Sequence, residues 1–224
     1  MEQSTPKIIV YSAIFGGYDR LREVEVVDPN VKYILFTDSP NLKSKTWDIQ
    51  LVSQQRNSRL YARSAKINNA IITADCDYYI WIDARFSPRC SNWLELCQQV
   101  EGVMCYRHDV RDCIYEEAKV CKEMKLDSDY AIDTMVKKLK RVNYPSHFGL
   151  QSSVFLIRKN TKEVQAFNED WLKCVSIYSV RDQLSLNYVA WEHGIKIQQP
   201  PKGVNVYDNP YLSKGNKHLK PRTL

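Results

Sequence analysis

The chain lacks the short motifs that mark several common enzyme classes. No G-x-G-x-x-G follows an expected strand, and no G-x-x-x-x-G-K-[ST], H-E-x-x-H or G-x-S-x-G occurs in its 224 residues. These absences disfavour classical dinucleotide-binding, P-loop, zinc-protease and serine-hydrolase functions.

Cysteine pairs at metal-binding or redox spacing are also missing. The chain has 7 cysteines, an odd number, and none of them forms a C-x-x-C pair. The amino terminus has no basic-then-apolar signal pattern, and no apolar run approaches the ~20 residues that span a membrane. We therefore expect a cytoplasmic protein with no membrane span.

The excess of charge of one sign is small. Lys and Arg outnumber Asp and Glu by 32 to 26, which gives a net charge of +6 and favours polyanionic ligands only weakly. A nucleic-acid binder is a possible reading of this charge, but the acids expected at strand ends would repel a phosphate backbone. The length fits one domain over residues 1–224, with 199–224 as an irregular tail that packs over it.

The sequence alternates between expected strands and helices. Apolar, β-branched runs predict strands at 7–15, 31–38, 48–52, 78–82, 102–106, 152–157 and 195–198. Helical periodicity covers 58–74, 92–100, 114–125, 129–141, 161–175 and 182–193. This alternation predicts an α/β fold, Rossmann-like, with a mostly parallel central sheet flanked by helices.

The run at 78–82 (YYIWI) is followed by Asp83-Ala84-Arg85. Ligands of open α/β sheets bind beyond the carboxyl ends of such strands, so Asp83 and Arg85 are candidate site residues. In the alternative, Asp83 caps a turn and Arg85 is a solvated surface residue. In the helix before this strand, Arg59, Arg63 and Lys66 share one face, which is either a solvated stripe or a phosphate-facing one.

Seven segments together resemble a known family. The chain is similar, from about Ile8 to Tyr188, to GT-A-type nucleotide-sugar glycosyltransferases, and more narrowly to a glycosyltransferase-like family that includes plant members linked to cell-wall polysaccharide. The residues that carry the resemblance are 11–19 (YSAIFGGYD), 36–38 (FTD), Arg63 with Lys66, 81–85 (WIDAR), His108 with Arg111, 115–118 (YEEA) and 181–185 (RDQLS).

The resemblance implies a donor site at the sheet edge. It places Tyr11, Ser12 and Asp38 at the nucleoside, and Arg63 and Lys66 at the diphosphate. Departure of a nucleoside diphosphate builds negative charge on the leaving oxygen, which cations must offset.

At the position of Asp83-Ala84-Arg85, most GT-A enzymes have Asp-x-Asp, whose carboxylates bind Mn²⁺ or Mg²⁺. Asp83 is therefore a candidate metal ligand, but the second carboxylate is replaced by Arg85, which would repel a hard cation. A divalent cofactor is doubtful, and we expect Arg85 to supply positive charge in its place.

The remaining candidates lie in the second half of the chain. Asp182-Gln183 resembles the Asp-Gln pair at the reaction centre of some retaining GT-A enzymes, with a helix N-cap as the alternative. Asp182, Asp83 and Glu117 are the predicted catalytic residues, and Gln183 and Arg85 the further donor ligands. His108 and Arg111 are predicted to bind acceptor or phosphate, with a structural histidine as the alternative.

The resulting hypothesis is a hexosyl- or pentosyltransferase in polysaccharide biosynthesis. It would move a sugar from a nucleotide-diphosphate donor to a hydroxyl of a glycan or glycoconjugate. The alternative is a non-catalytic nucleotide-sugar or glycan binding module, which the missing second acid favours.

Overall fold

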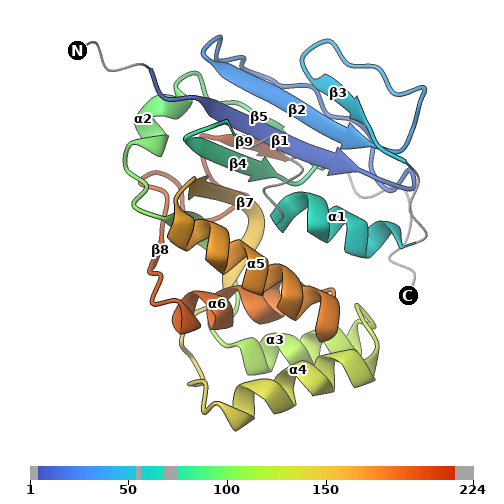
Figure 1. Cartoon of the computed structure of the whole chain (residues 1–224), viewed down its shortest axis with the longest axis vertical. Coiled ribbons are helices and arrows are strands. Elements are labelled where there is room, and N and C mark those ends of the chain that lie inside the picture. The colour runs from blue at the N-terminus through green and yellow to red at the C-terminus, as the bar shows by residue number, and fades with distance from the viewer. Residues whose placement is uncertain (1–4, 54–56, 68–74, 215–224) are drawn as a thin grey trace.

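The computed structural model describes residues 5–53, 57–67 and 75–214 (Figure 1). Within them, seven strands form the main sheet in the order β3-β2-β1-β4-β7-β6-β8. Their bounds are β1 Ile8–Ile14, β2 Val31–Thr37, β3 Asp48–Leu51, β4 Tyr78–Ile82, β6 Val103–Arg107, β7 Gln151–Lys159 and β8 Ile197–Gln198. The prediction of an α/β, GT-A-like fold around a mostly parallel central sheet is confirmed.

One strand, β7, runs against its neighbours. It pairs antiparallel with both β4 and β6, whereas β1, β2, β3 and β4 pair in parallel and β8 is parallel to β6. The beginning of β7 therefore lies beside the end of β4, where the Asp83 N–H donates to the Val154 carbonyl at 2.9 Å. Residues from about 151 to 154 thus reach the same sheet edge as Asp83.

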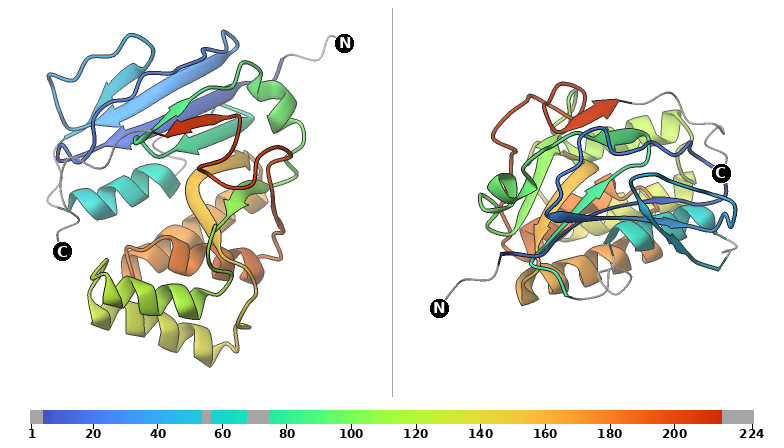
Figure 2. Two further views of the ribbon diagram at one scale, coloured as in Figure 1. Left: turned by 180° about the vertical axis from the view of Figure 1, so that it is seen from behind. Right: turned by 90° about the horizontal axis from the view of Figure 1, so that it is seen from above.

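Six helices flank the sheet in the described residues. They are α1 Ser58–Ile67, α2 Trp93–Cys97, α3 Ile114–Glu123, α4 Asp129–Arg141, α5 Lys162–Ile177 and α6 Gln183–Glu192. Helices α1, α5 and α6 pack together on one face, and α3 and α4 pack against α6 (Figures 1 and 2). The expected helix at 58–74 is observed as far as Ile67, and residues 68–74 lie outside the described part of the chain.

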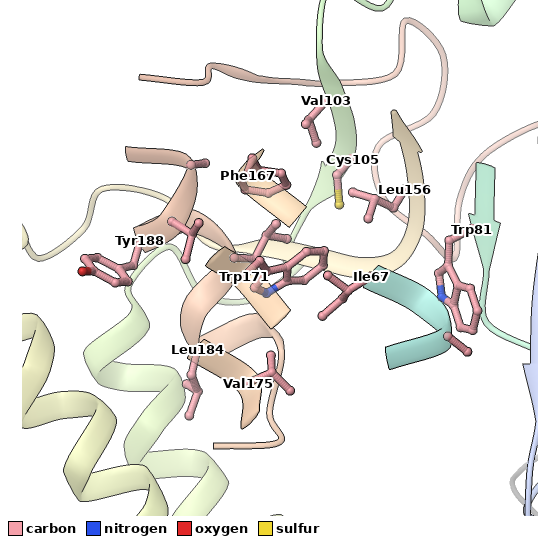
Figure 3. Close-up of a cluster of buried hydrophobic side chains, with 14 of the residues drawn as sticks. Ile67, Trp81, Val103, Cys105, Leu156, Phe167, Trp171, Val175, Leu184 and Tyr188 are labelled. Atoms are coloured by element: carbon pink, nitrogen blue, oxygen red, sulfur yellow. The ribbon is translucent and has the colours of Figure 1, made fainter. Parts of the chain in front are cut away.

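Burial on both faces explains the continuous apolar strands. In β1, Ile9 and Tyr11 enter a core shared with α1, α5 and α6, while Ile8 and Val10 enter a second core with α2. Figure 3 shows part of the first core, in which Trp81 and Leu156 lie near Ile67, and Trp171 and Phe167 come from α5. Successive side chains of a strand point to opposite faces, so a strand covered on both sides needs apolar residues throughout.

A second, two-stranded sheet was not predicted. β5 (Phe86–Pro88) pairs antiparallel with β9 (Leu212–Lys214), and Val206, Tyr211 and Leu212 are buried in the second core. The expected irregular tail at 199–224 thus contains one short strand, β9. Three-residue strands are too short to show an alternating pattern, and the prolines and glycine from 200 to 203 suggest only loop. Residues 215–224 of the tail lie outside the described part.

A buried arginine of β7 binds the backbone of α1. Arg158 is 0 % exposed and donates to the carbonyls of Lys66 (2.6 Å) and Ile67 (3.3 Å), the last two described residues of α1. It also donates to Asn168 Oδ1 at 2.6 Å and to the Tyr11 hydroxyl. Because these partners belong to α1, α5 and β1, the buried guanidinium ties α1 to the sheet and to α5.

We predict that Arg158→Met lowers the free energy of unfolding by about 3 kcal/mol, because it leaves several buried acceptors without a donor. Urea denaturation measures this change. The matched control is Lys159→Met, which removes a cation from the exposed next residue of β7 and should cost under about 0.5 kcal/mol. A loss below about 1 kcal/mol for Arg158→Met would contradict the assigned role.

Candidate active site

The candidate active site is organised around the ammonium group of Lys66. This side chain, on α1, is 2 % exposed, and its Nζ lies 2.8 Å from Asp182 Oδ2 and 3.2 Å from Asp83 Oδ1. Ser153 Oγ, at the start of β7, lies 3.4 Å from the same nitrogen. The three elements that meet here are the end of β4, the start of β7 and the segment before α6.

Asp182 is a buried carboxylate surrounded by donors. Its side chain is 3 % exposed, Arg63 Nε lies 3.2 Å from Oδ1, and Ser153 Oγ donates to Oδ2 at 2.8 Å. Burial alone would raise the pKa of Asp182, but the charges of Arg63 and Lys66, the hydrogen bond from Lys66 and the charge of Arg181 together hold it well below its ordinary value. Asp182 is therefore an ionised acid with weak basicity.

The N-cap alternative for Asp182 is wrong for the side chain. Asp182 does precede α6, but its carboxylate makes no capping hydrogen bond and faces Lys66 and Arg63 instead. Its backbone carbonyl accepts a hydrogen bond from Trp171 Nε1 at 3.1 Å. Both its carboxylate and its main chain are thus held by groups from other elements.

Asp83 has one engaged oxygen. Trp81 Nε1 donates to Oδ1 at 2.6 Å, and Lys66 Nζ is 3.2 Å from that same atom. The side chain is 27 % exposed, and Oδ2 has no hydrogen bond or ion pair within the described residues. Trp81 and Lys66 therefore fix the carboxylate while the second oxygen remains open to a ligand.

Arg85 follows Asp83 through a tight turn that the Phe86 N–H closes on the Asp83 carbonyl at 2.9 Å. Its Nη2 donates to the Tyr207 hydroxyl at 2.8 Å. The alternative that Arg85 is simply solvated is wrong, because it contacts a side chain 122 positions away. Sequence reasoning missed Tyr207 and Ser153, since neither stands in a pattern that separates it from loop or strand residues.

The donor set at Asp83 fits a divalent cation poorly. Such ions prefer several oxygen ligands, but Asp83 offers one open oxygen, Lys66 Nζ lies 3.2 Å from the other, and an arginine stands two positions on in place of a second carboxylate. A different cluster, Asp112, Glu116 and His147, has ligand atoms within 4.8 Å of one another. There His147 Nδ1 already pairs with Asp112 at 2.7 Å, and this hydrogen bond raises the pKa of His147, which favours the charged ring over a metal ligand.

Glu117, Arg111 and His108 form a second polar cluster at the start of α3. Glu117 is buried, and Arg111 Nε donates to its Oε2 at 2.7 Å. His108 Nδ1 accepts the N–H groups of Val110 and Arg111, both at 3.2 Å. Burial lowers the pKa of His108, with the charge of Glu117 opposing and that of Arg111 assisting, so the ring is neutral at physiological pH.

Gln183 and Arg181 connect the two clusters. Arg181 Nη2 donates to Gln183 Oε1 at 3.1 Å and lies 3.9 Å from Glu117 Oε1. Gln183 Nε2 in turn donates to the carbonyl of Gln151 at 3.2 Å. Gln183 is thus held beside Asp182 by the backbone of β7.

The three predicted nucleoside residues occupy different environments. Tyr11 is 0 % exposed inside the first core and hydrogen-bonds the Lys66 carbonyl and Arg158, so its side chain does not line the sheet edge. The Ser12 hydroxyl is buried and makes no hydrogen bond within the described part of the chain. Asp38 accepts the Gly16 N–H at 3.0 Å through each oxygen and holds the turn there, in which Gly16 has a φ of 62°.

The fold and the edge acids define a GT-A-like α/β protein. The family model described as TOD1/MUCI70, glycosyltransferase-like domain, matches residues 1–212. The chain therefore belongs to this glycosyltransferase-like family, which is related to plant cell-wall polysaccharide members. A search of curated proteins finds no match. No helix of the described residues is long and apolar enough to cross a membrane.

The pH dependence of stability tests the buried contacts of Asp182. An acid whose pKa falls on folding stabilises the protein above its unfolded pKa of about 3.9, and this contribution is lost as the pH falls toward the folded pKa. We predict that Asp182→Asn costs about 3 kcal/mol at pH 7, because it leaves Lys66 and Arg63 without their anion. The difference from wild type should shrink by about 1 kcal/mol at pH 3.

Urea denaturation at both pH values measures this, with Asp133→Asn as control, since Asp133 forms only a surface pair with Lys122. An Asp182→Asn penalty that is the same at pH 3 and pH 7 would contradict the depressed pKa.

Proposed function

We propose that this chain is a glycosyltransferase that moves a sugar from a nucleotide-diphosphate donor to a hydroxyl of a glycan or glycoconjugate. The observation that carries the proposal is the pair of acids, Asp83 and Asp182, held by one buried lysine at the carboxyl edge of the sheet. We take residues 1–224 as a single catalytic domain that transfers a hexose or a pentose in polysaccharide synthesis. Membership of the glycosyltransferase-like family supports this activity.

The proposal gives Lys66 a different role from the one first expected. Its ammonium is almost fully buried and is already in contact with two carboxylates, so it cannot also serve as the exposed cation for a diphosphate. Arg63, with a side chain 24 % exposed, and Arg85 are better placed for that contact. Lys66 then orients Asp83 and Asp182 from behind.

The two acids have separate parts in the proposed reaction. As the bond to the diphosphate breaks, positive charge develops at the anomeric carbon, and an ionised carboxylate can stabilise it. Asp182 suits this electrostatic role better than proton abstraction, because a depressed pKa makes a weak base. The open Oδ2 of Asp83 is available to bind a sugar hydroxyl of the donor.

The other predicted residues retain proposed roles. Ser12 and Asp38 are assigned to the nucleoside, and Gln183 to the donor sugar beside Asp182. His108 and Arg111 are assigned to the acceptor or to phosphate. Glu117 is buried against Arg111, so we assign it to the orientation of that arginine rather than to direct contact with the reacting atoms.

A non-catalytic module that binds nucleotide sugars is the second candidate. The observation in its favour is that both oxygens of Asp182 are engaged and its side chain is 3 % exposed, which leaves little of it for a substrate. Such a module would bind a donor without consuming it. The measurement that separates the two functions is donor turnover.

We predict that one nucleotide sugar raises the melting temperature and is slowly hydrolysed, and that Asp83→Asn lowers this turnover about 100-fold, because the donor sugar is no longer held in its reactive position. Chromatography of the released nucleotide measures the rate over a donor panel. Asp133→Asn, a surface control, should keep wild-type turnover. Donor binding without any turnover would favour the module, and no binding would contradict both functions.

We also predict that EDTA lowers this turnover less than twofold, because a cation has only one open oxygen of Asp83 to bind and is repelled by Arg85. Assays with EDTA, and with Mn²⁺ added back, measure the dependence. A steep loss in EDTA that Mn²⁺ restores would show that the charge of Arg85 does not replace the metal.

A further inference from the structure

Two cations meet at one aromatic side chain beside the candidate site. Arg85 Nη2 donates to the Tyr207 hydroxyl at 2.8 Å, and its guanidinium carbon is 5.8 Å from the centroid of that ring. Lys214 Nζ lies 4.4 Å from the same centroid. Because the face of an aromatic ring attracts cations, Tyr207 can hold two positive groups close together without neutralising either.

The small sheet brings these residues to Asp83. Phe86 pairs directly with Lys214 in the β5–β9 ladder, so Lys214 stands opposite the residue that follows Arg85. Arg85 also stacks on the buried Phe86 ring, at 5.0 Å from its centroid. The turn from Asp83 to Phe86 is closed by a backbone hydrogen bond of 2.9 Å, which keeps Arg85 next to the Asp83 end of β4.

The loop that carries Tyr207 is tightly hydrogen-bonded. Asn205 Oδ1 accepts the N–H groups of Tyr207 (2.8 Å) and Asp208 (3.1 Å), and Asn209 Oδ1 accepts those of Tyr211 and Leu212, both at 2.9 Å. Gly203 has a φ of 87°, and a Cβ there would lie 2.6 Å from Asn209 Cβ, so only glycine fits. Tyr207 is nevertheless 46 % exposed, because this loop presents it to solvent.

Neither cation has an acidic partner in the part of the chain that the structure describes. Arg85 and Lys214 form no ion pair within 4.0 Å there, whereas Lys66, Arg63 and Arg111 all do. Fixed positive groups without a counter-ion favour an anion, and a guanidinium with an ammonium suits phosphate oxygens. Together they carry two positive charges, which equals the charge of one Mn²⁺ or Mg²⁺ ion.

We propose that Arg85 and Lys214, gathered by Tyr207, form an anion site for the diphosphate of the donor, and that they take the place of the metal for which Asp83 is a poor ligand. This assignment rests on the proposed transferase function. In it, Arg85 and Lys214 contact the diphosphate, and Tyr207 is a positioning residue that acts through them.

The test measures binding of inorganic pyrophosphate and of UDP and GDP to the full chain by calorimetry in EDTA. We expect Arg85→Met and Lys214→Met each to weaken binding by about tenfold, as the loss of one charge-assisted contact does. Tyr207→Ala should weaken it by a similar factor although it removes no charge. Tyr207→Phe, which keeps the ring and removes the acceptor for Arg85, should have a smaller effect.

The matched control is Arg89→Met, which removes a cation that contacts Ser213 on the same small sheet. It should change the affinity less than twofold. Equal losses in the Arg89, Arg85 and Lys214 variants would indicate a general charge effect and overturn the proposal, as would unchanged binding in Tyr207→Ala. If Tyr207→Ala lowers the melting temperature, the affinities of Tyr207→Phe and Lys214→Met for pyrophosphate are compared with that of wild type instead.

The outcomes separate this site from the transferase function. If Asp83→Asn abolishes donor turnover but the Arg85, Lys214 and Tyr207 variants bind pyrophosphate as wild type does, the anion site is overturned and the transferase function is supported. If pyrophosphate binding depends on Arg85, Lys214 and Tyr207 but no donor is turned over, the anion site is supported and the transferase function is contradicted. A wild-type chain that binds neither pyrophosphate nor a nucleotide in EDTA overturns the site.

Discussion

The burial of one ammonium group sets the conditions for the rest of this structure. Removing Lys66 from water is costly, and only close carboxylates can compensate for it. Asp83 and Asp182 supply that compensation, although they lie on different elements and 99 positions apart. The same contacts that stabilise the lysine therefore fix the end of β4 against the start of α6. The same ion pairs therefore compensate for the buried charge of Lys66 and hold Asp83 and Asp182 close together.

The support for Lys66 extends beyond the site. Its backbone carbonyl is bonded to Arg158, and Arg158 is bonded to Asn168 of α5, so the helix that presents Lys66 cannot rotate without breaking buried hydrogen bonds. Tyr11 belongs to this support, which explains why a tyrosine stands in the buried strand β1. Its hydroxyl bonds the Lys66 carbonyl, an interaction that phenylalanine could not make.

Sequence reasoning succeeded where the physical signal was local. Continuous apolar strands and 3.6-residue periodicity predicted the main sheet and its helices, and the helix at 129–141 agrees with α4 at both ends. The prediction that Asp83 and Asp182 belong to one site stays a prediction, but the structure does bring both acids to Lys66. The direction of β7 was not predicted, since an apolar run reads the same in either direction, yet that direction brings Ser153 to Asp182.

The less predictable parts of the site depend on contacts over long sequence separations. Nothing around position 66 shows that its side chain faces inward, because a basic residue on a helix is usually solvated, and its burial follows only once Asp182 and Asp83 are placed. Tyr207 stands in a segment without periodicity, and its contact with Arg85 becomes apparent only once β5 and β9 are paired. In both cases the sequence gives the residue type, but the burial and contacts of the side chain depend on residues far away in the sequence.

The charges at the sheet edge also bear on why residue 85 is an arginine. In a site where Lys66 approaches Asp83 from one side, a metal would share that carboxylate with an ammonium 3.2 Å away and lose much of its attraction. A second carboxylate at 85 would add negative charge near Asp83 without a strongly held metal to offset it. An arginine in that place supplies positive charge directly. Lys66 thus offsets the charges of Asp83 and Asp182 from inside the protein, and the proposed anion site relies on Arg85 rather than on a metal.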